Sequence, residues 1–64
     1  MNKYNIGDYV EIKEMLGLFG CIFQIQEINL PIEDAPKYLY SINFSQIGCV
    51  YHAFWPDIVR KFDE

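Results

Sequence analysis

The chain has 64 residues, of which 52% are hydrophobic and 17% aromatic, and its formal net charge is −4. This length allows one domain at most, and the hydrophobic content excludes a disordered protein. The acidic balance disfavours nucleic acid as a partner, because the five cations are scattered along the sequence and phosphates repel net negative charge. We expect one small domain spanning residues 1–64, with an ordered core over about residues 6–62.

The first regular element is an alternating stretch at residues 9–14. Val10 and Ile12 fall on one face, which we expect to be buried. The opposite face should point to solvent and carries Tyr9, Glu11 and Lys13. This period of two predicts a half-buried β-strand.

A turn follows at residues 15–20 and contains two closely spaced glycines, Gly17 and Gly20. Such glycines allow the chain to reverse sharply between antiparallel strands. A second strand is predicted at residues 21–28. The next stretch, residues 29–37, is predicted to be a loop, because its prolines cannot donate to a strand ladder.

The remaining elements are short and separated by turn residues. Alternation predicts a third strand at residues 38–44, a turn at 45–48 and a fourth strand at 49–54. We expect one 3₁₀ turn at residues 55–57, before a last strand at 58–62. Five short strands with tight turns predict an all-β fold, a small closed or nearly closed barrel.

These residues resemble SH3-like barrels of the KOW and Tudor kind over about residues 6–62. The resemblance rests first on Gly7-Asp8 before the opening strand and on Gly17-x-x-Gly20-x-Ile22-x-x-Ile25. It rests also on the later matching positions, which are the strand at 38–44, Gly48, Tyr51, Phe54 and Asp57-Ile58. The resemblance implies a five-stranded SH3-like barrel. Proteins of this kind bind RNA, ribosomal proteins, methylated tails, peptides or larger enzyme complexes.

The turn at residues 15–20 departs from the pattern of RNA-binding relatives, which tend to carry basic and polar residues there. Here the turn is uncharged and its large side chains are Met15, Leu16, Leu18 and Phe19. Such side chains either fold back over the end of the barrel or form a contact surface for a protein, since Met and aromatic residues are favoured in interface cores.

The predicted contact surface extends to the loop and to the 3₁₀ turn. In the loop, Leu30 and Ile32 stand beside Glu33 and Asp34, a combination that suits a basic and partly apolar groove. The alternative is that the two apolar residues cap the open end of the barrel. Trp55 is the last residue of this predicted surface.

Aromatic residues gather in the second half of the chain, namely Tyr38, Tyr40, Phe44, Tyr51, Phe54 and Trp55. Three or four of them around one open pocket could bind a methylated lysine or arginine through cation–π attraction. A barrel core needs the same residues without a pocket, and we favour the core.

Catalytic and metal chemistry find little support in the sequence. Cys49 and His52 have a Cys-x-x-His spacing, but a zinc site needs a second such pair and a nucleophile needs an orienting third group. We expect no enzyme activity, no metal and no cofactor. Cys21 and Cys49 should be free thiols in a cytoplasmic protein, since we identify no signal peptide or membrane span.

The sequence therefore predicts a small, non-enzymatic interaction module that binds a protein partner as a subunit, adaptor or inhibitor. Two alternatives remain open. One is nucleic-acid or ribosome-associated binding of the KOW kind, and the other is recognition of a methylated peptide by an aromatic cage.

Overall fold

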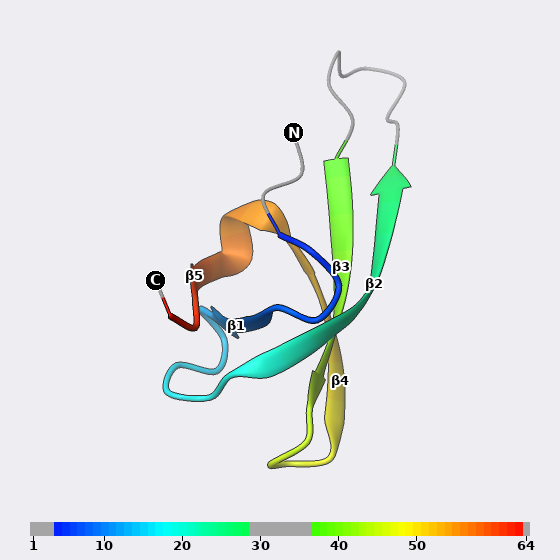
Figure 1. The fold of residues 1–64 in the computed structure, drawn as a ribbon. Helices are drawn as coiled ribbons and strands as arrows, with labels where there is room; N and C mark the ends of the chain where they lie inside the picture. The colour runs from blue at the N-terminus through cyan, green and yellow to red at the C-terminus, as the bar shows by residue number, and fades with distance from the viewer. Residues whose placement is uncertain (1–3, 29–36, 64) are drawn as a thin grey trace.

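The computed structural model describes residues 4–28 and 37–63 and shows an all-β protein (Figure 1). Five strands and one 3₁₀ turn follow one another as β1 (Tyr9–Ile12), β2 (Gly20–Ile28), β3 (Lys37–Phe44), β4 (Cys49–Phe54), η1 (Trp55–Asp57) and β5 (Ile58–Lys61). The five predicted strands and the 3₁₀ turn before the last strand are confirmed.

All neighbouring strands are antiparallel and form one sheet in the order β4-β3-β2-β1-β5. The sheet is not closed, so β4 and β5 are its edge strands. The long strand β2 pairs with β1 near its start and with β3 along most of its length. A register shift between Ile22 and Gln24 marks a bulge, and Figure 1 shows β2 bending on its way from β1 to β3.

The limits of β4 match the predicted limits, and those of the other four strands differ by one or two residues. β1 ends at Ile12 rather than at residue 14, because the backbone already turns there. The N–H of Lys13 donates to the carbonyl of Asp57 at 3.0 Å, and the N–H of Met15 donates to the carbonyl of Ile12 at 3.1 Å. These bonds replace the ladder that a longer strand would need.

The core lies on one face of the curved sheet and follows the predicted alternation. Its fully buried side chains are Val10, Ile12, Ile22, Tyr40, Ile42 and Phe44. Five partly buried side chains pack against it, namely Met15, Leu18, Ile25, Tyr38 and Tyr51. Burying this apolar surface is the main force that holds so short a chain together.

The two glycines of the predicted turn serve different needs. Gly17 has φ +93°, a backbone conformation that side chains with a Cβ rarely adopt. Gly20 instead is the first residue of β2 and is buried. A Cβ at Gly20 would lie 2.5 Å from Ile42 Cγ2 and 2.9 Å from the Phe44 ring. The second glycine is thus required by close packing, and the interpretation that both serve the reversal is wrong for Gly20.

Candidate functional site: the turn between β1 and β2

The structure divides the apolar residues of the β1–β2 turn into two groups. Met15 and Leu18 are partly buried and pack against the core. Leu16 points the other way and is 67% exposed, more than any other large hydrophobic residue among those described. The two alternatives for this turn therefore apply to different residues, since part of it folds back while Leu16 stays in solvent.

Phe19 closes the turn against the end of the chain. Its ring meets the ring of Phe62 edge to face, with centroids 5.3 Å apart and planes at 78°. The Arg60 guanidinium lies over the Phe19 ring, 5.0 Å from its centroid. Both arrangements are favourable for an aromatic ring, so Phe19 is held in place as well as partly covered.

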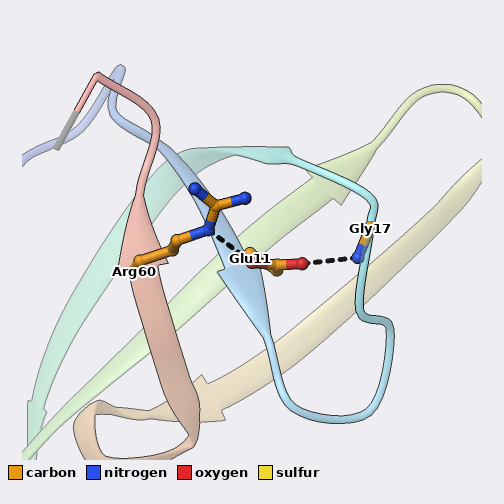
Figure 2. A network of polar contacts seen from close by, with 3 residues as sticks. All are labelled: Glu11, Gly17 and Arg60. Atoms are coloured by element: carbon orange, nitrogen blue, oxygen red, sulfur yellow. Dashed lines mark hydrogen bonds and ion pairs between the residues drawn. The ribbon is translucent and has the colours of Figure 1, made fainter.

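Glu11 fixes the turn from the neighbouring strand, as Figure 2 shows. The Nε of Arg60 donates to Glu11 Oε1 at 2.8 Å, while the N–H of Gly17 donates to Glu11 Oε2. Glu11 and Arg60 are cross-strand partners in the β1–β5 ladder, which places the carboxylate between β5 and the turn. One side chain therefore connects β1, β5 and the turn.

The prediction that Glu11 faces solvent is wrong, because only 6% of the residue is exposed. The Arg60 side chain and the turn cover the face of β1 that a single strand would leave open. The hydrogen bond from Arg60, followed by that from the Gly17 amide, lowers the pKa of Glu11 below its ordinary value of 4.5. The carboxylate is therefore charged at neutral pH, the state in which it accepts both bonds.

A second ion pair links the start of the turn to η1. Lys13 Nζ lies 3.1 Å from Asp57 Oδ1, and this bond raises the pKa of Lys13. The pair is largely solvent-exposed, so its contribution to stability is small. The pair matters more for binding to phosphates. Lys13 and Arg60 each already form an ion pair with a carboxylate beside the turn.

A shallow depression of about 240 Å³ lies next to the Phe19–Phe62 pair. Its lining residues are Gly7, Asp8, Tyr9, Lys61, Phe62 and Asp63. Tyr9 and Phe62 are brought together because the N–H of Phe62 donates to the carbonyl of Tyr9 at 2.7 Å. The exposure of Tyr9 agrees with the predicted solvent face of its strand. The position of Phe62 beside Tyr9 follows only from the pairing of β1 with β5.

Most of the predicted aromatic cage belongs to the core. Tyr40 and Phe44 are fully buried, and Tyr38 and Tyr51 pack against the core cluster. The rings that remain exposed are those of Phe54 and Trp55. The core interpretation is therefore correct for four of the six residues, and an open pocket built from three or four of them is not what the structure shows.

Of the remaining predicted contact residues, the structure describes only Trp55. Trp55 is exposed in η1. The loop residues Leu30, Ile32, Glu33 and Asp34 lie outside the described residues.

Cys49 and His52 do not form a catalytic pair. Side chains alternate along β4, so these two residues point to opposite faces of the strand. His52 Nδ1 lies 3.0 Å from Ser41 Oγ on β3, and the Cys49 thiol donates to the carbonyl of Val50. Cys21 and Cys49 are free thiols.

Among residues 4–28 and 37–63, no group of three His, Cys, Asp or Glu residues could hold a metal ion. Within these ranges there is likewise no helix long and apolar enough to cross a membrane.

Comparison of the chain with models of known protein families, with curated proteins and with solved structures finds no match in any of the three.

Proposed function

We propose that this protein is a non-enzymatic interaction module with an SH3-like barrel architecture, and that it binds a protein partner through the β1–β2 turn. Five antiparallel strands and the 3₁₀ turn before the last strand support the architecture, since the sequence resemblance implies both. The binding proposal rests chiefly on Leu16, a large apolar side chain held in solvent by a fixed turn.

Fixing the turn matters because an ordered loop loses less conformational entropy when it binds. Glu11 holds Gly17, the residue after Leu16, and Met15 and Leu18 anchor the turn on the core. Leu16 is then presented without further ordering of the backbone. Its burial in a partner gives about 1.5–3 kcal/mol, the usual gain for a leucine side chain.

The partner is expected to be a protein rather than a nucleic acid. A phosphate-binding surface needs unpaired cations, whereas Lys13 and Arg60 are both engaged by carboxylates beside the turn. The net charge of −4 favours a partner with a basic surface around the apolar contact.

The first test is photo-crosslinking in extract of the native host. A photoreactive amino acid replaces Leu16 in one sample and Val59, another exposed apolar residue, in a control sample. We expect one dominant protein cross-linked from position 16 and not from position 59. Equal cross-linking from both positions, or none from position 16, would contradict the proposal.

Salt dependence separates this proposal from the nucleic-acid alternative. Binding through apolar burial should change little between low and moderate salt, whereas binding to phosphates weakens steeply. A captured complex that contains RNA and dissociates with rising salt would favour the alternative.

A further inference from the structure

The β3–β4 hairpin beyond its first residue, Lys37, carries no formal charge. Residues 38–56 contain no Asp, Glu, Lys or Arg, so all nine acids and all five cations of the chain lie elsewhere. Part of this stretch faces solvent, including Ile47 in the turn and Val50 and Phe54 on β4. Depletion of charge among exposed apolar residues is typical of the centre of a protein interface.

β4 is also an edge strand without the usual protection. Its six residues contain no proline and no lysine, and its ladder with β3 runs from Leu39–Phe54 to Phe44–Cys49 without a register shift. The opposite edge, β5, is shorter, carries Arg60 and Lys61, and has a register shift in its ladder with β1. Proteins protect edges with such charges and irregularities, because a regular, apolar edge accepts another strand.

We propose that β4 pairs with β4 of a second copy of this chain and forms a two-fold symmetric dimer with a continuous sheet. β4 is complementary to itself, because a two-fold axis within the strand places the exposed Val50 of each copy opposite the exposed Phe54 of the other. Two copies that each carry a net charge of −4 repel one another, and the charge-free hairpin is the surface on which they can approach with the least repulsion. The β4 edge of one copy then satisfies the backbone groups of the other.

The faces of the sheet restrict the register of this pairing. Residues directly opposite each other in an antiparallel pair share a face, and side chains alternate along each strand. A two-fold axis at His52 places the exposed Val50 opposite Phe54 of the second copy, and the reverse. Aromatic and β-branched cross-strand pairs stabilise a sheet. A two-fold axis at Tyr51 would instead place Val50 opposite His52.

The dimer should not grow further. Among the strands of residues 4–28 and 37–63, β4 is the one unprotected edge of each copy, and a two-fold contact uses it in both copies at once. The edges left free are the two β5 strands, which carry Arg60 and Lys61. The assembly therefore closes at two chains.

Sedimentation equilibrium of the purified chain tests the proposal. We expect a mass twice that of the 7.6 kDa chain, falling toward the monomer on dilution. Val50→Lys should give a monomer with an unchanged circular dichroism spectrum, because it removes the apolar Val50–Phe54 pair across the interface and places a lysine on the β4 edge. Val59→Lys is the matched control, since Val59 is 52% exposed and Val50 51%, both on edge strands, and it should remain dimeric.

A nitroxide label on His52→Cys tests the axis, in a chain that also carries Cys21→Ser and Cys49→Ser. We expect dipolar broadening between the two labels that disappears when labelled chain is diluted with unlabelled chain. A label on Val59→Cys should show no broadening. Should the His52→Cys label show none while the dimer mass persists, the proposed interface is wrong.

Three further results would overturn the proposal, namely a monomer at every concentration, a dimer that survives Val50→Lys, and growth into larger assemblies. Leu16→Ser should leave the dimer intact, because the turn between β1 and β2 takes no part in the pairing. The dimer proposal and the partner-binding proposal can thus be contradicted independently of each other.

Discussion

At the scale of single residues, the most consequential feature is the carboxylate of Glu11. It accepts hydrogen bonds from a strand that follows it by 49 positions and from a turn that follows it by six. The alternation of residues 9–14 predicts that Glu11 faces solvent, and taken alone β1 would leave it there. Its burial results from the arrival of β5 and the turn on that face, which no local pattern encodes.

The network predicts how stability depends on pH. The pKa of Glu11 is lowered in the folded protein, so its contribution is fully present above the ordinary value of 4.5 and is lost as the pH falls through the lowered value. Urea unfolding at a series of pH values should show stability declining below about pH 4.5. Glu11→Gln should lose part of this decline and be less stable at neutral pH.

Glu27→Gln is the control for this measurement, because Glu27 is exposed on β2. It should retain the pH dependence of the unsubstituted chain. An unaltered pH profile in Glu11→Gln would show that the Glu11 network does not contribute to folding.

Gly20 gives a second prediction at the residue scale. Gly20→Ala places a Cβ within 2.5–2.9 Å of Ile42 and Phe44, so these core side chains must shift. Such overpacking should lower the free energy of unfolding by about 1–3 kcal/mol. Thermal or urea unfolding measures this change, and a stability equal to that of the unsubstituted chain would contradict the packing seen at Gly20.

At the scale of elements, the β1–β2 turn shows where prediction from sequence ends. Its position and its apolar character follow from the sequence, since Gly17 marks the reversal and four large side chains are evident. The different burial of Leu16 and Leu18 does not follow, because it depends on packing against a core built from strands far apart in sequence.

The turn predicts a difference between two leucines that are close in sequence. Leu18→Ala removes a side chain that packs against the core and should cost about 1–2 kcal/mol. Leu16→Ala removes an exposed side chain and should change stability by less than about 0.5 kcal/mol. Urea unfolding of both variants compares them directly. Equal losses in the free energy of unfolding would mean that the two side chains are not packed differently against the core.

At the scale of the whole molecule, the order and type of the elements were predictable because alternation, glycines and prolines are local signals. The limits of β4 and η1 match the prediction. The sheet order and the contacts between the chain end and the turn were not predictable from local signals, since they join residues far apart in sequence. Phe62 illustrates this limit. It contacts the Phe19 ring because its backbone is hydrogen-bonded to Tyr9, which is 53 residues earlier in the sequence.

The small size of the core makes the fold sensitive to single cavities. Ile42 is fully buried, and Ile42→Ala should cost about 2–5 kcal/mol. A chain of this length has a total stability of about 3–10 kcal/mol, so the variant should lose a large part of it. Circular dichroism and amide exchange measure the loss. A variant as stable as the unsubstituted chain would show that Ile42 is not part of the core.

The most direct test of the account is the affinity of the cross-linked partner for the chain and for Leu16→Ser, measured by calorimetry with both proteins shown to be folded. An apolar anchor at the centre of an interface contributes at least about 1.4 kcal/mol, so the account predicts a weakening of about tenfold or more. Equal affinity of the two proteins would contradict the claim that the fixed β1–β2 turn presents Leu16 to a partner.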